Sequence, residues 1–279
     1  MRAAGRRWGR GLKAALRWLV IVATVAVLDF AVLNTLLTSF KADAVISASP
    51  PVWVFEPVLT HYRNVFAGAY PFPSFFANSL AVSAGASALT LVAAFTAAYA
   101  IARRGAGRAQ LLPLVVSLRL MPPIVFAIPM FVLFQGLRLL DTRMGLILAN
   151  SVANLPLALL ILSGFIQDVP REVEEAARLD GCTTFGILWK VLLPLTLPGV
   201  ATAGILAFLW SWNEYLFGLM LTIRRATPVT VGASLFVTAW GIRWGDIAAA
   251  ISAAVVPTLA LTFFVQRYLV RGLSLGAVR

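Results

Sequence analysis

The sequence predicts an all-α membrane protein with six transmembrane helices, and three observations lead to this fold class. Of the 279 residues, 60% are apolar and 12% are charged, whereas about a quarter of the residues in soluble domains are charged. The mean hydropathy is +0.88. Apolar stretches of about 20 residues or more recur along the chain, and each is long enough to cross a hydrocarbon core about 30 Å thick.

The first apolar stretch follows a basic N-terminal segment, as the apolar region of a signal peptide does. It is too long for a signal peptide and lacks a convincing small-residue cleavage site, so we expect an uncleaved span. The chain divides into residues 1–74, with the N-terminal end, the first span and an outer loop, and residues 75–279, with the other five spans. The six predicted spans cover residues 18–40, 75–102, 111–134, 145–166, 198–221 and 247–268.

The formal net charge of +12 bears on the topology of these spans. Its basic residues are scattered over short loops and chain ends, whereas a nucleic-acid-binding domain gathers them on one face. With a cytoplasmic N-terminus, the inner segments hold fifteen Lys and Arg residues and the longer outer loops hold seven. This asymmetry predicts that both chain ends and the loop 167–198 lie in the cytoplasm.

The loop 167–198 is a charged, amphipathic interval between two apolar spans, and we expect it to contain two short helices. Pro170 suits the start of the first helix, because its missing N–H would be unpaired there. Gly181 can end that helix in the left-handed conformation. Glu174 and Arg178 stand four residues apart in the favourable order for an ion pair.

The second short helix follows Thr183 or Thr184, since either hydroxyl can cap its first turn. Pro194 and Pro198 must stop or kink it. By composition alone, the whole loop could also lie on the membrane surface with its charges in water.

The order of small and charged residues in this loop is specific. E-A-A is followed by D-G and then by L-P, and this spacing resembles the signature loop of the permease subunits of ABC importers. In that family the loop is a coupling helix seated in a groove on a cytoplasmic ATPase. Cys182 stands where the family usually has Ala, another small residue. The matching positions are Glu175, Ala176, Ala177, Asp180, Gly181, Leu193 and Pro194.

Further motifs resemble the maltose-type sugar permeases over roughly residues 61–279. They include W-N-E-Y at 212–215, T-P-V-T-V-G at 227–232 and the end G-L-S-L-G-A-V-R. The resemblance implies the type I architecture of ABC importers, a bacterial cytoplasmic membrane and a sugar as substrate. The partners it implies are a homologous second permease, two ATPase subunits and an extracytoplasmic solute-binding protein.

No cofactor or metal is expected in this chain itself. It lacks the G-x-x-x-x-G-K-[ST] loop that binds nucleotide phosphates. ATP and Mg²⁺ would therefore bind to the ATPase partner, and we expect this chain to have no enzymatic activity of its own.

Arg119 lies inside the third span, among several prolines. An Arg in the middle of a membrane costs about 2.5 to 3.5 kcal/mol on insertion scales, so its side chain should face polar surroundings. Two interpretations fit this requirement and are compatible with each other. Arg119 faces the substrate pathway, or it forms an ion pair with Asp29 of the first span.

The fifth span carries aromatic and polar side chains of the kind that bind sugars. Aromatic rings pack on the C–H faces of a sugar, and fixed polar groups bond its hydroxyls. The candidates are Trp210, Trp212, Asn213, Glu214 and Tyr215. The alternative is an aromatic belt at the membrane interface, with Asn213 and Glu214 bonded to neighbouring helices. In the resembled family one permease of a pair can hold most sugar contacts, so the second permease is another place for them.

A secondary transporter driven by an ion gradient is the alternative function from another class. It predicts inverted repeats and paired acids inside the membrane, whereas the spans contain only Asp29 and Glu214 and no obvious repeat. A membrane-embedded enzyme fits less well, because the spans contain no G-x-S-x-G, H-E-x-x-H or paired catalytic aspartates. His61, the single histidine, has no clustered ligands beside it in the sequence, so we expect surface packing rather than a metal site. The sugar, and the homodimeric or heterodimeric pairing of the permeases, stay open at this point.

Overall fold

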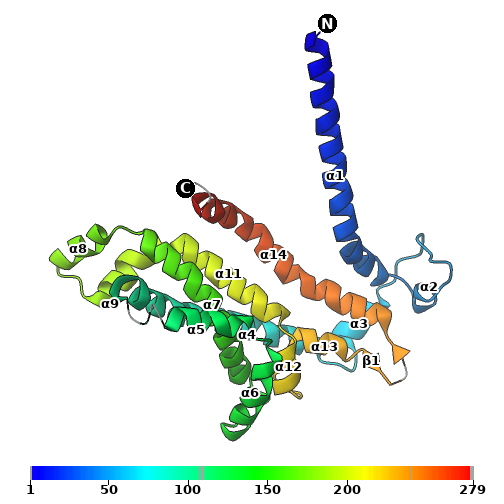
Figure 1. Cartoon of the computed structure of the whole chain (residues 1–279). Helices are drawn as coiled ribbons and strands as arrows, with labels where there is room; N and C mark the ends of the chain where they lie inside the picture. The colour runs from blue at the N-terminus through cyan, green and yellow to red at the C-terminus, as the bar shows by residue number, and fades with distance from the viewer. Residues whose placement is uncertain (1, 106, 108–109, 240, 277–279) are drawn as a thin grey trace. The chain divides into compact units, whose positions relative to one another are not determined.

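A computed structural model describes almost the whole chain and consists mostly of helices (Figure 1). The described residues are 2–105, 107, 110–239 and 241–276. They form two compact units, the chain up to Tyr70 with Phe236–Ala253, and Pro71–Leu235 with the chain from Ala254 onward. The segment Phe236–Ala253 therefore belongs with the first part of the chain, and the division into residues 1–74 and 75–279 stays a prediction. The motif residues 277–279 lie outside the described part.

The first unit contains the first predicted span and most of the predicted outer loops. Its two short strands pair antiparallel, with Val237 opposite Ile242. Segments from both halves of the sequence thus form one body. Its elements are α1 (Arg2–Thr38), α2 (Asp43–Ile46), α3 (Thr60–Ala67), β1 (Val237–Thr238), β2 (Gly241–Ile242) and the first residues of α14 (Trp244–Gly276).

The core of the second unit is made by three helices, α4 (Phe72–Arg104), α7 (Arg143–Asp168) and α11 (Leu197–Asn213), which pack along one another (Figure 1). Small residues at the contacts let the helix backbones approach closely, and hydroxyls bond across them. The Ser87 hydroxyl of α4 donates to the carbonyl of Gly204 in α11 at 2.6 Å. The alanines buried at these contacts include Ala86, Ala94, Ala98, Ala203 and Ala207.

The third predicted span is broken. Its two parts, α5 (Leu111–Leu120) and α6 (Ile124–Gly136), meet at a bend of 101°. Pro122 and Pro123 stand at the break, and Met121 before them is extended, the conformation that a residue before proline prefers. The prolines therefore account for the irregularity that the sequence predicts.

A second bend, of 83°, separates the segment Thr184–Leu195 from α11. Pro198 stands in the first turn of α11, where its missing N–H has no cost. This bend agrees with the predicted stop or kink near Pro194 and Pro198. The elements before it are α9 (Thr184–Gly186), the π-helix η1 (Ile187–Leu192) and α10 (Leu193–Leu195).

Within the described residues, four helices are long and apolar enough to cross a membrane, or six if each bent pair forms one span. This agrees with the predicted all-α membrane fold. The predicted fifth span, 198–221, is interrupted: α11 ends at Asn213 and α12 (Leu216–Leu221) follows as a separate helix. The cause is Glu214, whose backbone is extended and whose carboxylate accepts from the N–H of Phe217 at 2.8 Å, capping α12.

Two glycines test the packing of α11 against α7. A Cβ added at Gly199 would lie 2.4 Å from the ring of Phe165, whereas one added at Gly164 would meet nothing within 4 Å. We expect Gly199→Ala to lower the thermal unfolding midpoint of the detergent-purified protein by several degrees, because overpacking costs about 1–3 kcal/mol. Gly164→Ala should leave the midpoint unchanged or raise it, since Ala favours a helix by about 0.5–1 kcal/mol over Gly. Equal midpoints would contradict this packing.

Candidate functional site

The charged loop between the fourth and fifth spans forms short helical segments at one end of the second unit (Figure 1). Its first helix, α8 (Arg171–Leu179), begins directly after Pro170. The chain then turns at Gly181, whose φ of +81° lies in the left-handed region. The hydroxyl of Thr183 accepts from the N–H of Gly186 at 3.2 Å and caps α9. The start, the turn and the cap agree with the sequence prediction.

A buried ion pair fixes α8 to the end of α4. Glu174 is only 2% exposed, and its carboxylate accepts from the guanidinium of Arg103. The same guanidinium donates to the carbonyl of Val169 at 2.7 Å. The hydroxyl of Tyr99 lies 3.4 Å from the Glu174 carboxylate, and Arg178 lies 3.5 Å from it. Because these donors surround the buried Glu174 carboxylate, they fix the face of α8 that packs against the rest of the second unit.

The sequence predicts only the weaker of the two ion pairs of Glu174. The spacing of Glu174 and Arg178 predicts their ion pair, but the main partner, Arg103, is 71 positions away. A local pattern contains no information on so distant a partner. The only available signal was the pair of basic residues, Arg103 and Arg104, that ends an apolar helix.

The residues of the predicted signature divide between two faces of the loop. Ala177 is buried and packs in the core with Ile187 and Leu192 of η1. Two apolar side chains of the loop face outward instead, with Leu179 91% exposed and Phe185 73% exposed. The exposed signature residues are Glu175, Ala176, Asp180, Gly181 and Pro194, while Leu193 is half-buried.

Two of the predicted pathway residues are brought together. The guanidinium of Arg119 lies 4.0 Å from the ring centre of Trp210, a cation–π contact. Arg119 also donates to the carbonyl of Ala153 at 3.2 Å, and Trp210 is 47% exposed. Among the described residues of this unit, no carboxylate pairs with Arg119. Asp29 belongs to the other unit, so its pairing with Arg119 stays a prediction.

The other predicted pathway residues make local structural contacts. Trp212 is 2% exposed, and its indole N–H donates to the carbonyl of Ala254 at 3.1 Å. The amide of Asn213 donates back to the carbonyl of Leu209 at 2.8 Å, and Glu214 caps α12. Asn213 thus bonds within its own helix and Glu214 bonds the helix that follows it, so neither makes the contact with a separate neighbouring span that the alternative interpretation expects. Tyr215 is 42% exposed.

Comparison with known proteins identifies the family. The model of the family described as binding-protein-dependent transport system inner membrane component matches residues 88–275. The chain belongs to this family. Its permeases include relatives named for sugar transport, which confirms the predicted resemblance to sugar permeases of ABC importers.

Two relatives show how far the similarity of this permease extends. It is 36% identical over 247 residues to the sulfoquinovosyl glycerol transport system permease protein SmoH of Agrobacterium fabrum, covering 88% of this chain and 86% of the relative. It is 31% identical over 272 residues to the trehalose transport system permease protein SugB of Mycobacterium tuberculosis, covering 90% and 97%. A chain in the crystal structure of a bacterial ABC transporter involved in import of the acidic polysaccharide alginate aligns with a TM-score of 0.78 at 20% identity, covering 92% of this chain and 96% of that one. That likeness supports the fold.

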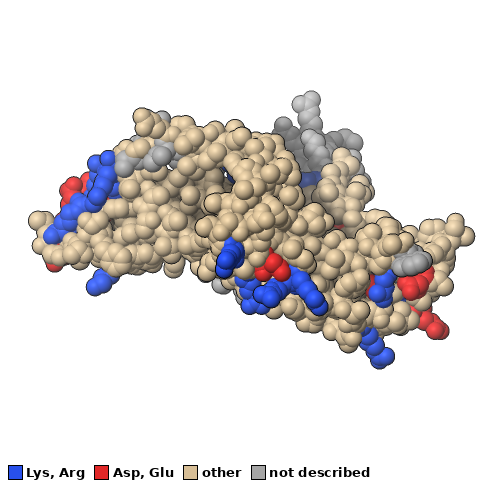
Figure 2. Space-filling model, turned by 90° about the horizontal axis from the view of Figure 1, so that it is seen from below, with Lys and Arg blue, Asp and Glu red and all other residues tan. Residues whose placement is uncertain are grey.

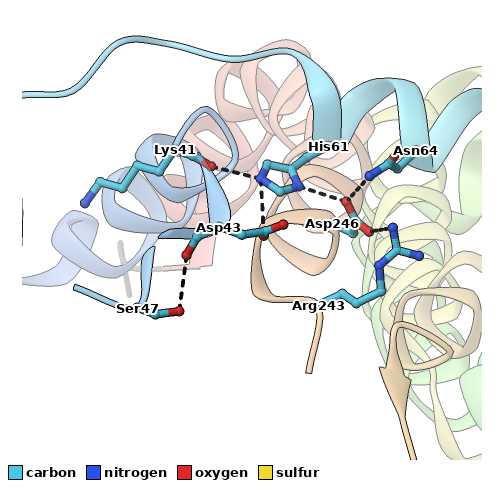
Figure 3. Close-up of polar contacts among 7 residues, drawn as sticks. All are labelled: Lys41, Asp43, Ser47, His61, Asn64, Arg243 and Asp246. Carbon is cyan, nitrogen blue, oxygen red and sulfur yellow. Dashed lines mark hydrogen bonds and ion pairs between the residues drawn. The ribbon is translucent and has the colours of Figure 1, made fainter. Parts of the chain in front are cut away.

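The first unit of the permease contains a polar cluster that the sequence did not predict (Figure 3). His61 is 3% exposed, and its Nδ1 lies 2.9 Å from the carboxylate of Asp246. Its Nε2 lies 2.8 Å from the carbonyl of Lys41, and Asn64 and Arg243 also contact Asp246. The expected surface packing of His61 is therefore wrong, because distant segments close over its ring. Among the described residues no group of His, Cys, Asp and Glu suits a metal ion.

The buried ion pair of α8 can be tested with the thiol of Cys182, which directly follows the Gly181 turn. Glu174→Gln should leave Arg103 buried without a charged partner, and breaking such a pair costs about 3–5 kcal/mol. We expect α8 to detach locally and the rate of maleimide labelling of Cys182 to rise at least fivefold in the detergent-purified permease.

Glu175→Gln provides the matched control, because Glu175 is the exposed neighbour of the same charge. It should change the labelling rate less than twofold. Equal labelling of the two variants would show that the ion pair does not fix the loop.

Proposed function

We propose that this permease is a subunit of an ATP-driven importer of a sugar, in which it forms half of the translocation pathway and couples to a cytoplasmic ATPase. The complex contains a homologous second permease, two ATPase subunits that bind ATP and Mg²⁺, and an extracytoplasmic solute-binding protein. Relatives named for transport of trehalose and arabinooligosaccharides support a mono- or oligosaccharide as the substrate.

The geometry of the charged loop carries this proposal. Its inner side is fixed by Arg103 and Glu174, while its outer side exposes Leu179 and Phe185. Large apolar side chains that project from a charged loop are costly in water and suit burial against a protein partner. A groove on an ATPase subunit would bury both side chains, and the fixed inner side would transmit movement of the loop to α4.

The orientation of the permease follows from its basic residues. Arg103 near the end of α4 and Asn78 near its start are 25 residues apart, about 38 Å along a helix. This length matches the thickness of a membrane, so the charged loop and the loops near Asn78 lie on opposite sides. The positive-inside rule assigns the charged loop and both chain ends to the cytoplasm.

Arg119 and Trp210 are the residues that we assign to the sugar pathway. Trp210 is 47% exposed, and Arg119 retains donors beyond the one that bonds Ala153. Together they can stack on a sugar ring and donate to its hydroxyls. We leave Trp212 out of the pathway because its ring and N–H are already used in packing.

An ion-driven secondary transporter is not favoured. Of the two intramembrane acids that the sequence offered it, Glu214 uses its carboxylate to cap α12 through the N–H groups of Phe217 and Gly218. The family to which the chain belongs is also one of binding-protein-dependent transport.

The double substitution Leu179→Ser and Phe185→Ser tests ATPase coupling. The ATPase groove would bury both apolar side chains, and each is expected to contribute about 1–2 kcal/mol to binding. Their loss should therefore weaken ATPase binding at least tenfold. ATP-dependent sugar uptake into proteoliposomes containing the complete importer should fall in parallel, while the permease still inserts into the membrane.

Leu137→Ser is the matched control, because Leu137 is 58% exposed but lies after α6, away from the charged loop. It should leave copurification of the ATPase unchanged. Uptake that is driven by an ion gradient without ATP, or normal ATPase binding by the double variant, would contradict the proposed function.

A second experiment tests the pathway assignment. Trp210→Ala removes the ring face and should raise the KM for sugar uptake about tenfold, whereas Trp210→Phe should keep it within about threefold because a ring remains. The maximal uptake rate at saturating sugar serves to separate recognition from assembly. An unchanged KM in Trp210→Ala would exclude Trp210 from the pathway.

A further inference from the structure

Four arginines gather at the end of the second unit that lies opposite the charged loop. They come from the segment after α6, the start of α7 and the segment after α12, and all four are exposed. Figure 2 views the protein from the side toward which α6 and α12 point in Figure 1, and it shows basic side chains around an acidic group there. None of the four forms an ion pair with a described residue. They are Arg138, Arg143, Arg224 and Arg225, which we call the arginine patch.

Asp141 organises the patch through the backbone. Its carboxylate accepts from the N–H groups of Ile223, Arg224, Arg225 and Ala226 at 2.9–3.1 Å. Burial alone would raise the pKa of Asp141, but these N–H groups outweigh it and lower the pKa, so the carboxylate stays charged at neutral pH. The segment 223–226 is thus wrapped around one side chain.

Asn78 of α4 joins this segment to α7. It is fully buried, and its amide donates to the carbonyls of Arg225 and Thr227 at 2.9 and 3.0 Å. Its oxygen accepts from the Nε of Arg143 at 2.8 Å. Because Arg143 and the backbone of Arg225 share one buried partner, the Arg143 side chain and the backbone that carries Arg224 and Arg225 are held in place relative to each other.

The proposed orientation places the arginine patch on the outer side of the membrane, where positive charge is unusual. Four guanidinium groups and one carboxylate leave a formal charge of +3 on the outer side of the membrane, where Lys and Arg are disfavoured. All four are Arg rather than Lys, and Arg binds carboxylates through two parallel N–H donors. The built backbone frame supports a specific partner with fixed carboxylates.

We propose that the arginine patch docks an acidic surface of the importer's solute-binding protein. This inference rests on the proposed function, which supplies the partner, and adds the surface and the chemistry by which that partner is recognised. Lipid headgroups could bind exposed arginines too, but they need no fixed backbone frame, whereas matching carboxylates on a folded protein do.

The experiment uses the assembled importer in nanodiscs of neutral phosphatidylcholine and measures the Kd of the sugar-loaded solute-binding protein. The double reversal Arg224→Glu and Arg225→Glu is expected to raise the Kd at least tenfold. Raising the salt concentration should weaken binding to the unmodified importer more than binding to the variant, because salt screens an attraction in the unmodified patch but a repulsion between the new glutamates and the acidic partner in the variant. Should the double variant fail to assemble, Arg224→Gln replaces it, with about a threefold rise expected.

Arg63→Glu is the matched control, since Arg63 is an exposed arginine of α3 with no ion pair to a described residue and the same predicted outer location. It should leave the Kd within twofold. An unchanged Kd in the double reversal overturns the inference, as does an effect that appears only in discs with anionic phosphatidylglycerol, which would assign the patch to lipid. If the unmodified importer shows no ATP-dependent uptake, the proposed function itself fails; normal uptake with an unchanged Kd removes the docking inference alone.

Discussion

Backbone polar groups freed at helix breaks need hydrogen-bond partners, and the permease depends on a few side chains that supply them. Asp141 accepts four N–H groups after α12, and Glu214 accepts two N–H groups at its start. Asn78 donates to two carbonyls, and Arg103 donates to the carbonyl of Val169. An unsatisfied buried group costs about 1–3 kcal/mol, so Glu214, Asn78 and Arg103 permit bends that an uninterrupted helix would not allow, whereas Asp141 orders an exposed turn.

Some charged side chains therefore have a structural role where the sequence suggests a ligand-binding role. In the sequence, Glu214 beside three aromatic residues suggests a sugar-binding carboxylate, but the structure commits both of its oxygens to the backbone. Arg119 differs, because its guanidinium lies over the ring of Trp210 and bonds one carbonyl only. Our proposal for the pathway therefore rests on a contact between two spans rather than on the W-N-E-Y motif, and no single segment displays that contact.

The sequence predicted those features whose causes are local. Chain turns at Gly181 and breaks at Pro122, Pro123 and Pro198 follow from backbone rules, and the spans follow from apolar length. The ion pair of Arg103 with Glu174 joins positions 71 apart, and the bonds of Asp141 join positions more than 80 apart. Such partners depend on how α4, α7 and α12 pack, and the periodicity of residues within one helix does not predict that packing.

Two polar anchors stand on the same helix, one near each end of α4. Asn78 fixes the segment of the arginine patch, and Arg103 fixes the charged loop through Glu174. A buried ion pair often stabilises a fold no more than apolar residues of the same size would, so stability alone is a weak reason for placing one here. The ion pair and the buried amide do restrict where their partners can lie, because a guanidinium or an amide forms good hydrogen bonds only over a narrow range of partner positions. We infer that the polar residues at the two ends of α4 serve to fix the placement of two loops, one at each end of the helix.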